Sequence, residues 1–107
     1  METPDLETVA EKLRRRAEHM GAIGGTVLID LGDQGIMIDG QTTPLTVSCE
    51  RQAADCRVRM KLPLLDDILE GRKKAFSAFL TGQIGINGDM SVAVKLQPLL
   101  QSNTDAV

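Results

Sequence analysis

The chain has 107 residues, 42% hydrophobic and 25% charged, with a formal net charge of −3. This length fits one domain with its own core, which must be aliphatic because Phe76 and Phe79 are the only aromatic residues. An acidic balance without aromatic stacking platforms argues against nucleic acid as a partner.

The first predicted element is an amphipathic helix that begins near Thr3 and ends at Gly21. Thr3 is a suitable N-cap, and Pro4 suits the first helical position. One face of this helix is apolar at helical spacing: Leu6, Val9, Ala10, Leu13, Ala17 and Met20.

Lys12 and residues 14–16 form a basic cluster late in this helix. One interpretation is transient contact with the head groups of an anionic membrane surface. The other is that the cluster complements the helix dipole on a solvated face, where Glu11 and Glu18 dilute its charge.

Five short segments then alternate apolar and polar residues with a period of two. The apolar positions are Val27, Ile29 and Leu31, then Ile36 and Ile38, then Leu45, Val47 and Cys49, then Cys56, Val58 and Met60, and finally Ile84 and Ile86. This alternation predicts an antiparallel sheet with one covered face and one solvated face. We expect Asp30, Asp39 and Glu50 to lie near Arg57 and Arg59 on the solvated face.

A short helix is predicted between Pro63 and Gly71, with apolar residues at Leu64, Leu65, Ile68 and Leu69. Asp66 and Asp67 are neighbours on it and therefore point in different directions, so they do not form a catalytic pair. We expect both to face solvent.

Residues 73–80 are predicted to be helical or irregular, with Phe76, Phe79 and Leu80 directed inward.

The last predicted helix begins at an N-cap, Asp89, and is apolar on nearly all sides. We expect a kink or break near Gln97, because Pro98 cannot sit unstrained inside a helix. A surface helix ordinarily has an apolar stripe about 100° wide. One side of this helix can pack on the sheet, which leaves a second helix, a partner chain or an apolar ligand to cover the other.

Little in the sequence suggests catalysis. His19 is the only histidine, so no Ser–His–Asp set and no metal site can be assembled around it. The glycine-rich stretch at 21–25 follows a helix and lacks the Lys-Ser/Thr of a phosphate-binding loop. We predict no enzyme activity, no cofactor and no metal.

Cys49 and Cys56 are the only cysteines, and the N-terminal stretch lacks the apolar run of a signal peptide. No apolar run approaches the 18 residues or so of a membrane span. These features predict a cytoplasmic protein with two buried, reduced thiols. We expect the thiols to face each other across a hairpin.

The stretch AFLTGQIGINGDM at 78–90, continued by Ala93 and Leu96, resembles the C-terminal signature of the sterol carrier protein 2 family. Upstream, residues 54–60 resemble the family's alternating strand segment. Leu65, Leu69 and Gly71 match the spacing of its short helix and of the glycine that ends it.

This resemblance implies an α+β fold in which helices cover one face of a five-stranded, mainly antiparallel sheet. It also implies an apolar cavity between sheet and helices, which would account for the apolar excess of the last helix. Residues 1–107 would form a single domain of this type, with a polar tail at 102–107.

We predict non-catalytic binding of a hydrophobic molecule, such as a fatty acyl, sterol-like or isoprenoid lipid, with transfer inside the cell. The residues expected to line the site are Leu65, Ile68, Leu69, Phe76, Phe79, Leu80, Ile84, Ile86, Met90, Val94 and Leu96. The alternative is a protein-interaction or homodimerisation module that uses the same groove, for example as an accessory factor in lipid or quinone metabolism.

Overall fold

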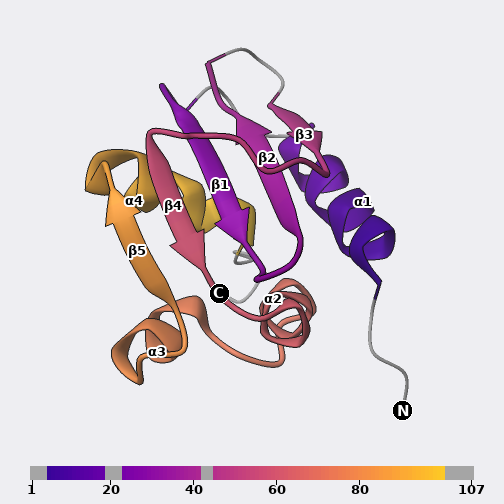
Figure 1. The fold of residues 1–107 in the computed structure, drawn as a ribbon. Helices are drawn as coiled ribbons and strands as arrows, with labels where there is room; N and C mark the ends of the chain where they lie inside the picture. The colour runs from indigo at the N-terminus through magenta and orange to yellow at the C-terminus, as the bar shows by residue number, and fades with distance from the viewer. Residues whose placement is uncertain (1–4, 19–22, 42–44, 101–107) are drawn as a thin grey trace.

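The computed structural model describes residues 5–18, 23–41 and 45–100 (Figure 1). Its elements are α1 (Leu6–Ala17), β1 (Thr26–Asp30), β2 (Gly35–Asp39), β3 (Thr46–Ser48), β4 (Cys56–Arg59), α2 (Leu62–Leu69), α3 (Ala75–Leu80), β5 (Gly85–Gly88) and α4 (Met90–Leu100). The expectations for His19, Met20, Gly21 and the tail at 102–107 lie outside the described residues.

The start of α1 differs from the sequence expectation. Its N-cap is Asp5, whose carboxylate accepts a hydrogen bond of 2.8 Å from the Thr8 backbone N–H. The prediction of Thr3 as the N-cap is therefore wrong. Asp5 satisfies the same geometric requirement two residues later, and Thr3 and Pro4 lie outside the described residues.

The strands form one five-stranded sheet in the order β3-β2-β1-β4-β5. Three of the four pairings are antiparallel, and the pairing of β1 with β4 is parallel. The register places Ile29 beside Ile36 on one side and beside Val58 on the other. The apolar sides of neighbouring strands therefore coincide, and the predicted α+β architecture is confirmed.

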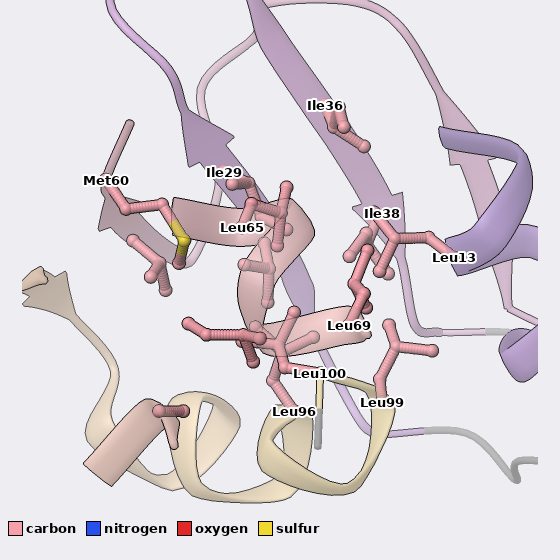
Figure 2. Close-up of a cluster of buried hydrophobic side chains, with 14 of the residues drawn as sticks. Leu13, Ile29, Ile36, Ile38, Met60, Leu65, Leu69, Leu96, Leu99 and Leu100 are labelled. Carbon is pink, nitrogen blue, oxygen red and sulfur yellow. The ribbon is translucent and has the colours of Figure 1, made fainter. Parts of the chain in front are cut away.

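Helices α1, α2 and α4 pack against this apolar face and share one core with it (Figure 2). Leu13 of α1, Leu65 of α2 and Leu96 and Leu99 of α4 are almost completely buried there. In Figure 1, α4 lies behind β4 and β1.

The opposite face of the sheet is less solvated than predicted. Leu28 and Met37 point to this outer face, yet both are buried. The segment at 49–55 crosses it to connect β3 with β4 (Figure 1). A Cβ atom on Gly35 would lie only 2.7 Å from Cγ of Arg51 and 3.0 Å from Leu28, so the Arg51 stem packs closely there.

The charges on the outer face gather around Asp30. Its carboxylate pairs with Arg51 at 2.6 Å and with Arg57 at 3.6 Å. Asp39 and Glu50 instead accept hydrogen bonds from Gln41 and Gln52, which are close to them in sequence. The broader cluster of five charges expected on this face does not form among the described residues.

Asp66 does not face solvent as predicted. Its side chain is largely buried between α1 and α2, where it pairs with Lys12 at 2.5 Å and with Arg72 at 2.9 Å. Asp67 pairs with Arg72 at 2.8 Å. Two nearby cations compensate the desolvation of the Asp66 carboxylate, a long-range arrangement that helical periodicity does not reveal.

Most of the basic cluster of α1 serves the fold. Lys12 also pairs with Glu70 at 2.8 Å. Arg14 donates a hydrogen bond to the Val47 carbonyl at 3.2 Å. Arg16 donates to the carbonyls of Leu69, Leu99 and Leu100, at the ends of α2 and α4.

Helix α4 continues through Pro98 to Leu100, so the expected break near Gln97 does not occur. Leu99 and Leu100 are buried, and Arg16 binds both of their carbonyls. These contacts hold the last turn in place despite the proline.

Both cysteines are free, but they do not face each other. Cys49 follows β3 at one edge of the sheet, whereas Cys56 lies in β4, beyond β2 and β1. The prediction that the two thiols face each other across a hairpin is wrong, because the segment that connects β3 with β4 crosses the sheet.

Candidate functional site

An apolar cavity of about 240 Å³ lies between the β4–β5 side of the sheet and helices α3 and α4. All of its lining residues are apolar: Val58, Ala75, Phe76, Phe79, Ile84, Ile86, Met90, Ala93, Val94, Leu96 and Leu100. Such a lining offers dispersion contacts and exclusion of water, without a side chain that could act as acid, base or nucleophile.

Local sequence features build each wall. Val58 and Ile86 are direct partners across the antiparallel β4–β5 pair, so their side chains lie next to each other on the face that meets the helices. On α4, Met90, Ala93 and Val94 lie three and four residues apart and thus share one side. The third wall is α3, which contributes Ala75, Phe76 and Phe79 from successive turns.

Gly88 makes the sharp transition from β5 to α4. Its φ is +104°, and an added Cβ atom would lie only 2.4 Å from the Asp55 carbonyl oxygen. The next residue, Asp89, donates its backbone N–H to that same oxygen at 2.9 Å. A glycine is therefore required where the sheet wall meets the α4 wall.

The two apolar sides of α4 have different roles. Val92, Leu96, Leu99 and Leu100 are buried, and Leu96 and Leu100 also reach the cavity. Met90 and Val94 line the cavity but remain 51% and 65% exposed. One side of the helix thus belongs to the core, while the other forms the cavity wall and its open rim.

Seven of the residues expected at the site line the cavity: Phe76, Phe79, Ile84, Ile86, Met90, Val94 and Leu96. Leu65, Ile68 and Leu69 of α2 lie in the closed core instead. Leu80 is 67% exposed and outside the lining.

The inward orientation expected for α3 is wrong. Phe76 and Phe79 are 62% and 41% exposed at the cavity, and the buried residues of this helix are Ala75 and Ala78. The two small residues allow α3 to approach the rest of the fold, which turns the larger side chains toward the rim.

Sequence reasoning missed four lining residues: Val58, Ala75, Ala93 and Leu100. Ala93 is three residues after Met90, so helical spacing could have suggested it. Val58 required the pairing of β4 with β5, which periodicity does not supply.

No group of histidine, cysteine or acidic residues suited to holding a metal occurs among the described residues. No helix in the described part of the chain is long and apolar enough to cross a membrane. Burial raises the pKa of the Cys56 thiol, and burial also raises that of Cys49, which suppresses the thiolate form at neutral pH.

Residues 6–101 match the model of the SCP-2 sterol transfer family. The chain belongs to this family. The resemblance seen in the sequence is thereby confirmed over nearly the whole chain. A comparison with curated proteins gave no match.

Solved structures show the same fold at low sequence identity. Sterol carrier protein 2 like 2 from Aedes aegypti is 20% identical, with a TM-score of 0.74 over 86% of this chain and 93% of that one. A palmitated form of the Aedes aegypti protein, solved in solution, is also 20% identical, with a TM-score of 0.72 over 91% and 95% of the two chains.

Other proteins contain the fold in different settings. The ubiquinone synthesis protein UbiJ-SCP2 is 16% identical, with a TM-score of 0.56 over 91% of this chain and 78% of that one. An alkylsulfatase from Pseudomonas is 21% identical, with a TM-score of 0.57 over 87% of this chain but only 14% of the enzyme. The match to the enzyme therefore concerns one part of a much longer chain.

Proposed function

We propose that the protein binds an apolar molecule non-covalently in the cavity between β4, β5, α3 and α4 and acts as a carrier without catalysis. The observation that carries this proposal is a cavity lined wholly by apolar side chains yet open beside Phe76, Met90 and Val94. In a closed core these side chains would pack on one another, whereas here a ligand can bury their exposed carbon surface.

The cavity size favours a slender ligand. Small-molecule pockets commonly measure about 300–1,000 Å³, and this cavity of about 240 Å³ lies just below that range. An acyl or isoprenoid chain can enter by one end and leave its polar end at the rim. A rigid sterol would require the walls to separate. The palmitated form of the Aedes aegypti protein supports the acyl-chain option.

The proposed setting is the cytoplasm, with transfer of the ligand between membranes.

Lipid extraction from purified protein, together with native mass spectrometry, tests the proposal directly. We expect co-purified acyl or isoprenoid lipid, or uptake of added fatty acid at one molecule per chain. A protein that remains ligand-free after both treatments would contradict the proposal.

A matched pair of variants then locates the ligand. Ala93→Phe places a ring into the cavity from α4, and we expect at least about tenfold weaker binding of a fluorescent fatty acid, equivalent to about 1.4 kcal/mol. Ser91→Phe adds the same ring at an exposed position outside the lining and should bind as the wild type does. If Ala93→Phe bound the fatty acid as tightly as Ser91→Phe and the wild type do, this cavity would be excluded as the binding site.

The second candidate is an interaction or dimerisation module. The observation in its favour is the exposed apolar surface of α3, where Phe76 and Leu80 are 62% and 67% exposed. Sedimentation velocity at increasing protein concentration distinguishes the two candidates. The interaction module would be supported by a ligand-free dimer in the wild type that dissociates into monomers in the variant Leu80→Gln.

A further inference from the structure

We infer that Leu100, together with Leu96, forms the closed end of the cavity and determines how long an apolar chain the cavity accepts. A bound ligand then has its methyl end against these two leucines and its polar head at the rim. This inference rests on the proposed function and adds the residue that limits the length of the ligand.

The lining residues of α4 differ in burial along the helix. Met90 and Val94, in the first turns, are exposed at the rim, whereas Leu96 and Leu100, in the later turns, are buried. Leu96 and Leu100 are four residues apart and therefore share one side of the helix. From Met90 to Leu100 the helix rises by about 15 Å. The cavity is thus open near the start of α4 and closed near its end.

The core around α2 begins directly behind this closed end. Leu100 lines the cavity and also belongs to the buried cluster that contains Leu65 and Leu69 (Figure 2). The Arg16 guanidinium binds the carbonyls of both Leu69 and Leu100, so the ends of α2 and α4 lie side by side. The Leu100 side chain therefore fills the space through which the cavity would otherwise extend toward α2. This position accounts for the absence of Leu65 and Leu69 from the lining.

The closed end suits a methyl group better than a polar head. Leu96 and Leu100 are buried and their side chains offer no hydrogen-bond partner, so a polar group placed there would lose its water without replacement. Arg16 lies outside the lining, and its guanidinium already donates to three carbonyls. At the rim, the exposed side chains of Met90 and Val94 leave the head group in contact with water.

The depth of the cavity fits a single acyl chain. The hydrocarbon core of a bilayer is about 30 Å thick, so one chain in one leaflet spans about half of that distance. The stretch of α4 from Met90 to Leu100 has a comparable length. Each methylene that enters the cavity should strengthen binding about fourfold. Once the methyl end reaches Leu100, further methylenes remain at the rim and add little.

A series of saturated fatty acids, from octanoic to stearic acid, measures this limit. Displacement of a fluorescent fatty acid gives the affinity of each member. In the wild type the affinity should rise with chain length and then level off at a limiting length. Leu100→Ala should move the limiting length to longer chains, because the cavity gains depth. Leu100→Phe should move it to shorter chains. General destabilisation of the fold would not produce opposite shifts from one position.

The matched control is Leu99→Ala. Leu99 precedes Leu100 in the same turn and is completely buried, but it does not line the cavity. The control removes the same atoms from the core, so it lowers stability through the same mechanism and should keep the limiting length of the wild type. Circular dichroism verifies the fold of each variant. If the alanine variants fail to fold, Leu100→Val and Leu99→Val repeat the comparison with a smaller truncation.

A chemical change at the far end of the ligand tests its orientation. ω-Hydroxylauric acid carries a hydroxyl group at the end that lies against Leu100, where it finds no hydrogen-bond partner. It should bind at least about tenfold more weakly than lauric acid. The methyl ester of lauric acid is altered only at the head and should retain binding. Equal affinities of ω-hydroxylauric acid and lauric acid would overturn the inference.

The chain-length series also separates this inference from the carrier proposal. If the wild type bound none of the fatty acids, the carrier proposal would fail and the inference with it. If the wild type bound them with a limiting length that neither Leu100 variant moved, the carrier proposal would stand and the inference alone would fail. A shift in Leu99→Ala equal to that in Leu100→Ala would have the same meaning.

Discussion

At the scale of single residues, Arg16 connects three helices. Its guanidinium donates to the Leu69 carbonyl at the end of α2 and to the Leu99 and Leu100 carbonyls at the end of α4, the latter two at 3.2 and 2.7 Å. The last carbonyls of a helix lack partners within the helix and carry partial negative charge. One cation on α1 thus satisfies two helix ends and sets the position of α4.

Replacing Arg16 should destabilise the protein and loosen the cavity wall. We expect Arg16→Met to lower the free energy of unfolding by about 2–3 kcal/mol, since buried carbonyls lose a charged donor. Arg15→Met, one residue earlier and largely exposed, should change it by no more than about 0.5 kcal/mol. Urea titrations followed by circular dichroism compare the two, and equal midpoints would refute the role of Arg16.

Asp30 makes stability depend on pH. The hydrogen bond from Arg51, followed by that from the Gly32 N–H, lowers the pKa of the Asp30 carboxyl below its ordinary value. A carboxyl whose pKa is lower in the folded state stabilises the fold above its unfolded pKa of about 3.9. This contribution is lost as the pH falls through the folded pKa.

Asp30→Asn should therefore narrow the difference in urea midpoint between about pH 7 and pH 3, because the asparagine cannot be protonated in this range. Glu18→Gln, which removes an exposed carboxylate at the end of α1, is the control. If the urea midpoint of Asp30→Asn fell between pH 7 and pH 3 by as much as that of Glu18→Gln, the ion pair of Asp30 would not be the source of the pH dependence.

At the scale of elements, periodicity predicted more of the fold than of the site. Alternation around Val27, Ile29 and Val58 located strands correctly, because a half-buried strand presents every second residue to the core. The same rule cannot identify a strand's neighbours, so the parallel pairing of β1 with β4 was not foreseen. In α3 the short alanines took the buried positions, against the expectation from hydrophobicity that Phe76 would be inward.

The turn between β5 and α4 depends on Gly88. Gly88→Ala must accommodate a positive φ and a Cβ atom 2.4 Å from the Asp55 oxygen, so we expect a loss of about 2–3 kcal/mol and weaker fatty-acid binding. Gly82→Ala has a similar φ of +83° but no atom within 4 Å of the added Cβ, so its cost should be about 1 kcal/mol. Thermal unfolding measures the stability of both variants. If both lost the same stability, the close approach of the added Cβ atom to the Asp55 oxygen would not contribute to the cost at Gly88.

At the scale of the whole molecule, the strand order determines which distant residues can meet. The connection across the sheet places β4 three strand spacings from β3, which corresponds to roughly 14 Å at ~4.8 Å per spacing. In the sequence Cys49 and Cys56 are separated by only six residues, which suggests that they lie close together in the fold.

The folded chain should therefore not form an internal disulfide. Cysteine Cα atoms must lie within about 7 Å of each other to be bridged, and the raised pKa of both thiols slows oxidation further. We expect mild oxidant to leave two titratable thiols in native protein and to form the bridge only in urea. Mass spectrometry after alkylation checks this, and a bridge formed without denaturant would contradict the strand order.

The shallow anchoring of α3 has a consequence for the rate of ligand exchange. Only Ala75 and Ala78 of this helix are buried, and two methyl groups contribute little hydrophobic free energy compared with the leucines that fix α4. Backbone amides of α3 should exchange with deuterium through local opening, well before those of β1 and β2 at the centre of the fold. Bound fatty acid should slow exchange in α3 selectively, so the lifetime of the complex would be set by how often one short helix separates from its neighbours.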